Sequence, residues 1–142
     1  MSLKSKYAVR CGGCFNHRAS LGEHVLIKEN HITACGGIAA AVKAAMNYAP
    51  GKPVEVEVEN LAELEEALAA ACDRIMLDNF SLEHTVQAVN LSNGRVELEA
   101  SGNVTEATLL AIAQTGVDFI SSGAIIHQAK SLDLSLKAVI NK

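Results

Sequence analysis

Short runs of apolar and β-branched residues alternate along the chain with longer stretches, rich in alanine and leucine, whose apolar positions follow the helical period. The runs predict strands at residues 24–28, 53–59, 73–78, 94–101 and 116–122. The stretches predict helices at 3–11, about 37–49, 61–72, 82–92, 105–115 and 128–140. Ser81 and Thr105 are the expected N-caps of two of them. Alternation of this kind is typical of βα units built on a parallel sheet.

The number of units limits the architecture. A length of 142 residues corresponds to one domain, and a hydrophobic content of 49% is enough for a core. A closed eight-unit barrel takes about 250 residues, so the pattern predicts an open sheet or part of a barrel. We expect residues 1–142 to form a single partial α/β-barrel domain, with residues 1–5 derived from a tag or disordered.

Composition excludes several classes of protein. A net charge of −4 argues against nucleic-acid binding, which needs a basic face. There is no run of 18 apolar residues and no signal-peptide pattern, so we expect a cytoplasmic protein without a membrane partner. The four cysteines are expected to be reduced. Cys11 and Cys14 have C-x-x-C spacing but no second ligand pair, whereas Cys35 and Cys72 are expected in the core.

Every predicted strand delivers polar residues or glycines to one rim, the carboxyl ends of the strands, where parallel α/β proteins bind ligands. These residues are Lys28, Asn30 and His31; Glu55, Glu57 and Glu59; Asp78 and Asn79; Glu99, Ser101 and Gly102; and Ser121 to Gly123. Charge is also uneven, because residues 1–31 have a local net charge of +3 within an acidic chain. The pattern indicates a binding rim with a basic side that attracts anions.

The run VEVEVEN places Glu55, Glu57 and Glu59 on one face of a strand. An exposed edge strand would explain this alternation without any function. In an interior strand covered by helices, adjacent carboxylates need a cation, because buried like charges are costly. With Asp78 at the end of the next strand, the residues predict an oxygen-lined Mg²⁺ site.

Two glycine-containing loops, 100–105 and 121–125, follow the last two strands and together predict a phosphate site. Arg18, His17 and Lys28 predict the anion-binding counterpart, since Arg18 suits a bidentate carboxylate. Lys28 also permits a second interpretation, a Schiff-base lysine like that of an aldolase.

Six motifs in order carry a resemblance to a known family: CGGCFNHR, LIKENHI, VEVEVEN, IMLDN, EASGNVT and TGVDFISSGAIIHQAKSLDLSL. They resemble the C-terminal barrel of quinolinate phosphoribosyltransferase, and the similarity runs from about Lys6 to Leu136. Cys14 stands where this family usually has a glycine, and Ser122 where a small apolar residue is common.

The resemblance implies an enzyme that converts quinolinate and phosphoribosyl pyrophosphate to nicotinate mononucleotide, CO₂ and pyrophosphate, with Mg²⁺, in NAD biosynthesis. It implies quinolinate binding by His17, Arg18 and Lys28, and binding of ribose hydroxyls and metal by Glu57 and Asp78. Lys28, Glu57 and Asp78 would be the catalytic residues. The 5-phosphate would lie at Ser101, Gly102, Gly123 and His127.

Family members resemble this chain only in their last half. They carry before it an α/β domain and a barrel strand with an Asp-Thr-Arg-Lys-Thr motif, and they are expected to form homodimers or larger homo-oligomers. We therefore expect a barrel fragment without its first strand or strands, with little turnover and a tendency to self-associate. Two alternatives stay open: a paralogue associated with molybdenum transport, and a non-catalytic module that binds phosphate or carboxylate.

Overall fold

The computed structural model describes residues 3–18 and 22–124. Its elements in chain order are α1 (Leu3–Cys11), β1 (Val25–Ile27), α2 (Glu29–Cys35), α3 (Ile38–Tyr48), β2 (Val54–Val58), α4 (Leu61–Ala69), β3 (Arg74–Asp78), α5 (Leu82–Ser92), β4 (Glu97–Ser101), α6 (Glu106–Ala113) and β5 (Phe119–Ile120). All the predicted strands are present, and each is shorter than expected, β5 most of all. The predicted helix 128–140 lies outside the described residues.

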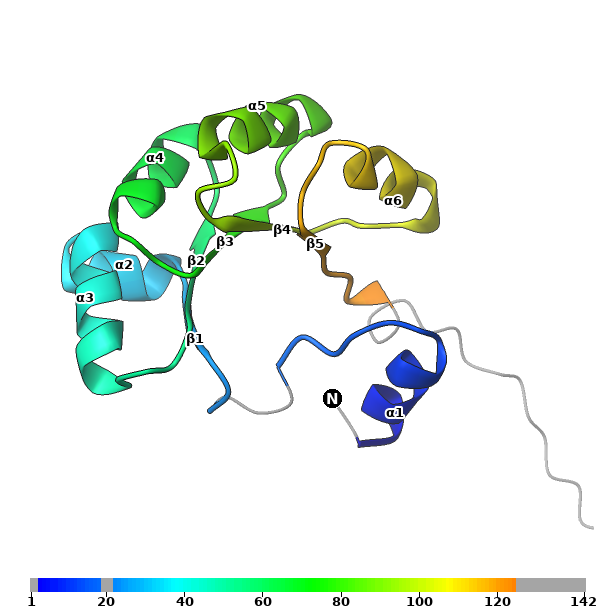
Figure 1. Ribbon diagram of the computed structural model, residues 1–142, viewed down its shortest axis with the longest axis horizontal. Coiled ribbons are helices and arrows are strands. Elements are labelled where there is room, and N and C mark those ends of the chain that lie inside the picture. Colours follow the sequence, from blue (N-terminus) through cyan, green and yellow to red (C-terminus); the bar gives the residue numbers. More distant parts are fainter. Residues whose placement is uncertain (1–2, 19–21, 125–142) are drawn as a thin grey trace, which may run out of the picture.

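The strands form one parallel sheet in the order β1-β2-β3-β4-β5. Because each strand lies beside its predecessor and such crossovers share one hand, their helices lie on one face of the sheet. Figure 1 shows α2 to α6 along the convex side of an arc of strands, with α1 on the open side. Within the described residues β1 and β5 each have one neighbour, so the barrel is not closed. The predicted incomplete barrel is confirmed.

The core lies between the sheet and the helices on its convex side. Val54, Val56 and Val58 of β2 are at most 1% exposed, and Ile38 of α3 and Leu64 of α4 pack in the same cluster. On β2, β3 and β4 the other face carries charged and polar side chains, among them Glu55, Arg74 and Glu99, because β-strand residues alternate between faces. The apolar residues Leu26, Met76 and Phe119 lie at the same register positions on this face. The concave face is therefore the place to look for a site.

Side-chain hydrogen bonds fix the ends of several elements. Asn60, Ser81 and Thr105 are N-caps of α4, α5 and α6, and each accepts a hydrogen bond from a backbone N–H in the first turn. The two N-caps expected from the sequence are thus confirmed. Asp73 accepts from Val54 N at 2.7 Å and Asp118 from Leu98 N at 2.8 Å, which ties the start of each strand to its neighbour.

Helix α2 is absent from the sequence prediction. It begins directly after Lys28, whose backbone N–H donates to His31 Nδ1 at 3.0 Å, and it ends at Gly36 in the left-handed conformation. Its length of 7 residues is too short for a convincing helical period. One consequence is that Cys35, expected in the core, is exposed at its end, whereas Cys72 is buried as expected.

Helix α1 forms where predicted, but it buries none of its residues, and Leu3 and Tyr7 are 88% and 71% exposed. Residues 3–5 form the first turn of this helix. Among the helices of the described ranges, none is long and apolar enough to cross a membrane.

Candidate substrate site on the concave face

Polar side chains line the concave face in two layers: an amino-end layer that contains Glu55, Arg74, Glu97 and Glu99, and a carboxyl-end layer that contains Lys28, Glu57, Asp78 and Ser101. Glu57 and Glu99 both lie level with Met76, and their contacts assign them to different layers. Glu55 is paired with Arg74, which is paired with Glu97, at the amino-terminal ends of their strands. Asp78 is paired with Ser101 at the carboxyl ends. The carboxyl-end layer is where a parallel α/β protein binds its ligands. The amino-end layer is a separate charge cluster.

Lys28 and Glu57 meet in the carboxyl-end layer. Lys28 follows β1 and Glu57 lies on β2, and Lys28 Nζ is 2.5 Å from Glu57 Oε2. The lysine side chain is 49% exposed and the carboxylate 12%. Sequence reasoning predicted that the carboxylates of β2 need a cation, and for Glu57 the chain itself supplies one. The exposed ammonium is also free to contact a carboxylate ligand.

Asp78, Ser101 and Gly102 are held together at the ends of β3 and β4. The backbone N–H of Asn79 donates to the Ser101 carbonyl at 2.9 Å, and Asn79 Nδ2 donates to Asp78 Oδ2 at 3.0 Å. Gly102 has a φ of +85°, and a Cβ there would lie 2.2 Å from Asn79 Oδ1. Only glycine permits this close approach.

The two predicted phosphate loops are neighbours. Ser122 Oγ, in the loop after β5, donates to the carbonyl of Val104 in the loop after β4 at 3.3 Å. Gly123 is exposed beside this contact, and Gly102 is half-buried. The described part of both loops thus agrees with a single phosphate site. His127, assigned to the same site, lies outside the described residues.

His17 and Arg18 are not brought to Lys28 by any contact in the described residues. His17 Nε2 instead lies 3.4 Å from Glu55 Oε2 and 3.4 Å from Glu99 Oε1. Arg18 is half-buried, and its carbonyl accepts a hydrogen bond from the Lys6 side chain. The predicted basic pocket is therefore divided, with Lys28 in one layer and His17 in contact with the carboxylates of the other.

The side chains of the amino-end layer shift one another's pKa values. The close interaction of His17 with Glu55 raises the pKa of the imidazole, whereas burial lowers the pKa of His24. Burial acts to raise the pKa of Glu55, but His17, His24 and Arg74 outweigh it and the pKa is lowered. Burial, with the charge of Glu55 beside it, raises the pKa of Glu99. The pKa shifts of His17 and Glu55 thus follow from the short distance between opposite charges.

Sequence reasoning missed His24 and Arg74. Arg74 contacts Glu97 Oε2 at 2.8 Å and Glu99 Oε2 at 3.4 Å, and its guanidinium lies 3.9 Å from the centre of the Phe119 ring. A usable signal was present, because Arg74 and Asp78 occupy same-face positions of one strand. His24 immediately precedes a strand, where nothing in its neighbours marks it as inward-facing.

Glu57 and Asp78 form the donor set for the predicted Mg²⁺. Glu57 is paired with Met76, and Asp78 lies two residues further along the same strand, so both carboxylates face the concave side. Mg²⁺ in phosphate-transfer sites uses one or two carboxylates together with substrate phosphates, which this pair fits. Lys28 already contacts Glu57, so the ion would compete with an ammonium.

Fold and rim together define an α/β protein with an incomplete barrel of parallel strands. A model described as quinolinate phosphoribosyl transferase, C-terminal domain, matches residues 1–137. The chain belongs to this family, and the resemblance carried by the six motifs is confirmed.

Relatives agree in sequence and in structure. The chloroplastic carboxylating nicotinate-nucleotide pyrophosphorylase of Arabidopsis thaliana is 47% identical over 156 residues, covering 96% of this chain and 45% of the relative. The solved nicotinate-nucleotide pyrophosphorylase from Francisella tularensis is 56% identical with a TM-score of 0.83, covering 91% of this chain and 46% of that one. NadC from Streptococcus pyogenes is 50% identical with a TM-score of 0.84, covering 94% and 47%. The chain spans about half the length of the curated relatives that it matches.

Proposed function

We propose that this chain supplies the barrel half of a quinolinate phosphoribosyltransferase of NAD biosynthesis. The enzyme would join quinolinate to the phosphoribosyl group of phosphoribosyl pyrophosphate, giving nicotinate mononucleotide, CO₂ and pyrophosphate. The Lys28–Glu57 pair carries the proposal, because it places a cation and a carboxylate at the carboxyl ends of adjacent strands. The family match supports the same conclusion.

Lys28 would bind a quinolinate carboxylate, with Arg18 and His17 as the further anion-binding groups. For His17 this requires the imidazole to leave Glu55 and Glu99, since these carboxylates would repel a dicarboxylate. Glu57 and Asp78 would accept hydrogen bonds from the ribose hydroxyls. Ser101, Gly102, Gly123 and His127 would bind the 5-phosphate through backbone N–H groups and side chains.

The chemistry needs positioning and charge more than proton transfer. As the bond from the anomeric carbon to pyrophosphate breaks, positive charge develops on the sugar, and Glu57 and Asp78 would stabilise it. The pyridine nitrogen attacks that carbon, and the resulting quaternary nitrogen accepts the electron pair released when the adjacent carboxylate leaves as CO₂. The ring carbon then takes up a proton. Mg²⁺ held by Glu57 and Asp78 would neutralise the departing pyrophosphate.

A binding measurement tests the proposal without requiring turnover. Phthalate has the two carboxylates of quinolinate but no ring nitrogen, so it binds without reacting. In calorimetry we expect phthalate to bind the full chain and Lys28→Ala to weaken this binding by more than about tenfold, as loss of a charge-assisted contact predicts. Lys43→Ala, which removes an exposed lysine on the convex side, should leave it unchanged.

Other outcomes would contradict the assignment. Binding of phosphoribosyl pyrophosphate without any binding of phthalate would favour a phosphate-binding module. Trapping of a carbonyl substrate on Lys28 by borohydride would favour the Schiff-base interpretation.

Location and assembly stay predictions. We propose a cytoplasmic protein, although the relatives from Arabidopsis thaliana and Nicotiana tabacum are named chloroplastic and mitochondrial. We also propose a homo-oligomer, which is supported by the single-sided pairing of β1 and β5 in the described part of the sheet. Sedimentation as a stable monomer would contradict it.

A further inference from the structure

Two carboxylates lie buried in the amino-end layer without hydrogen bonds that would account for their burial. Glu55 is 2% exposed and Glu99 is 1% exposed. Within the described residues, neither oxygen of Glu55 nor Oε1 of Glu99 has a partner in hydrogen-bond geometry. Buried carboxylates are normally paired and fully hydrogen-bonded, or they coordinate a metal. His17 and His24 face these oxygens as ion-pair partners but not in hydrogen-bond geometry, so the group of side chains suits a cation between them.

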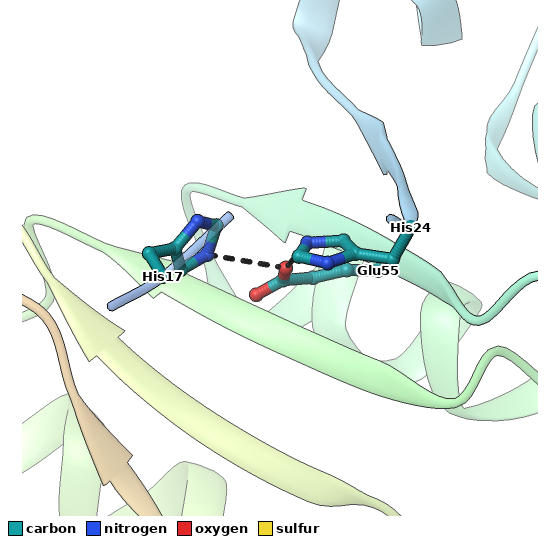
Figure 2. Close-up of side chains that lie close together, drawn as sticks. All are labelled: His17, His24 and Glu55. Carbon is teal, nitrogen blue, oxygen red and sulfur yellow. Dashed lines mark ion pairs between the residues drawn. The ribbon is translucent and has the colours of Figure 1, made fainter. Parts of the chain in front are cut away.

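Two histidines converge on the same carboxylate from separate segments. His17 follows α1, His24 precedes β1, and Glu55 lies on β2, as Figure 2 shows. His24 Nε2 is 2.8 Å and His17 Nε2 is 3.4 Å from Glu55 Oε2. The imidazole rings are 5.2 Å apart, edge to face, and His24 Nε2 also lacks a hydrogen bond in the described structure. Both histidines thus present a ring nitrogen to one oxygen.

The spacing of these atoms suits a metal ion. One donor atom from each of the three residues lies within 4.8 Å of the other two. Donors about 2.0–2.2 Å from a tetrahedral ion are about 3.4 Å apart, which the His17 contact already matches. The closer His24 contact, at 2.8 Å, would have to open by about 0.6 Å to reach this separation. Glu99 Oε1, 3.4 Å from His17 Nε2, is available as a fourth ligand or as a contact that orients His17.

An ion can also reach the site. His24 and Glu55 line a cleft of about 440 Å³ together with Glu23, Asp73 and Glu97. A second cleft, of about 550 Å³, is lined by His17 and again by Glu23. Arg74 also lines the first cleft and Arg10 the second, so both clefts have a basic side chain as well. In the first cleft the carboxylates outnumber the arginine, and such a lining attracts cations.

We propose that His17, His24 and Glu55 bind a divalent first-row transition-metal ion, of which Zn²⁺ is the best match. Two imidazole nitrogens and one carboxylate oxygen are donors that Zn²⁺ accepts, whereas Mg²⁺ prefers oxygen alone. This site uses neither Glu57 nor Asp78 and lies in the opposite layer of the concave face. It shares His17 with the proposed quinolinate contacts, so coordination of the ion by His17 and contact of His17 with quinolinate would exclude each other. A Zn²⁺ titration needs no turnover and therefore tests the ion site separately from the proposed function.

Binding would fix the segment between α1 and β1 to the sheet. In the described structure ion pairs hold His17 at the concave face, and the His17 side chain is 31% exposed. A coordinated ion replaces these contacts with bonds to β2 and to the residue before β1. The ion would therefore order the open side of the partial barrel, where α1 contributes no buried residue.

Calorimetric titration of the full chain with Zn²⁺ tests the proposal. Cys11, Cys14 and Cys35 are exposed and must first be changed to Ser, because thiolates bind Zn²⁺. We expect one Zn²⁺ per chain, with His17→Ala and His24→Ala each weakening binding by more than about tenfold, as for loss of a metal-site group. His84→Ala removes an exposed histidine of α5 and should have no effect.

Two further measurements separate a lost ligand from a lost fold. Glu55→Gln keeps the shape of the buried side chain and should weaken binding while the far-UV circular dichroism stays unchanged. Co²⁺ in place of Zn²⁺ should give d–d bands without a thiolate charge-transfer band. Absence of saturable Zn²⁺ binding by the folded chain that lacks the exposed cysteines would overturn the proposal, as would equal binding by His24→Ala.

Discussion

Lys28 Nζ lies 2.5 Å from Glu57 Oε2 and thereby joins the carboxyl ends of β1 and β2. The contact is made at the open rim, where the lysine side chain is 49% exposed. An ion pair of this exposure contributes little to stability, because water screens it and the lysine loses rotamer freedom. We therefore expect the pair to serve ligand binding, by placing a cation and a carboxylate side by side at the rim.

A double-mutant cycle of unfolding free energies checks this conclusion. We expect Lys28→Ala, Glu57→Gln and the combined variant to give a coupling energy of about 0.2–1 kcal/mol, the range for exposed pairs. Urea denaturation monitored by circular dichroism measures it. A coupling well above this range would mean that the pair is a structural contact, and the rim would then be less available to substrates.

The pH dependence of stability should reveal the contact between His17 and Glu55. Because this contact raises the folded-state pKa of His17 above 6.5, protonated His17 stabilises the fold fully below that value. The stabilisation is lost as the pH rises through the raised pKa. The difference in unfolding free energy between the original chain and His17→Gln should therefore shrink as the pH rises above 6.5 and through the raised pKa of His17. EDTA excludes metal from the experiment.

Histidine titration by NMR supplies an independent measure. We expect a midpoint above 6.5 for His17, and one below 6.5 for His24 because burial lowers its pKa. The two rings lie 5.2 Å apart, so the order of their midpoints reports directly on which imidazole holds its proton beside Glu55. The reverse order would contradict the arrangement in the amino-end layer.

Thiol reactivity should distinguish the cysteines. Burial raises the pKa of Cys72 to about 11, and its Sγ is also hydrogen-bonded to the Ala67 carbonyl at 3.5 Å. At about pH 8 almost no thiolate forms there, and only the thiolate is nucleophilic. A disulfide reagent such as DTNB should react rapidly with Cys11, Cys14 and Cys35, which are exposed, and with Cys72 only after denaturation. Cys72→Ala should leave the rapid phase unchanged, and rapid reaction at all the cysteines of the native chain would contradict this.

The strands could be predicted from sequence because each combines branched apolar residues with a period of two, as Val54, Val56 and Val58 do. The face occupied by Glu55 and Glu57 followed from the same period. Helix α2 could not be predicted, because its signals are a short polar turn and the glycine at position 36, and they compete with the end of a strand. Local pattern thus indicates faces better than short elements.

The contacts across the concave face depend on register and on the path of a connecting segment. Arg74 meets Glu97 because β3 and β4 pair at these positions, and a shift by one residue would separate them. His17 reaches Glu55 because the chain after α1 turns into the concave side. Neither contact produces a periodic pattern in the sequence. The rim residues could therefore be predicted, whereas the contacts of the amino-end layer could not.

Gly102 offers the sharpest test of the rim. Its φ of +85° makes any other residue strained, and a Cβ would lie 2.2 Å from Asn79 Oδ1 and 2.9 Å from the Asn79 backbone nitrogen. The left-handed backbone alone costs about 1–2 kcal/mol for alanine. Gly102→Ala should exceed that cost, because the loop must also move away from Asn79, whose N–H bond to Ser101 aligns β3 with β4.

Gly94→Ala is the matched control for Gly102→Ala. Gly94 has a φ of +70° and open space around its Cβ position, so it reports backbone strain without a steric clash. We expect Gly94→Ala to lower the free energy of unfolding by the strain alone and to leave phosphoribosyl pyrophosphate binding intact. Gly102→Ala should lower stability further and weaken that binding, because displacement of the loop moves Ser101 and the backbone N–H groups after it. Equal effects of the two variants on both measurements would show that the close approach to Asn79 does not shape the rim.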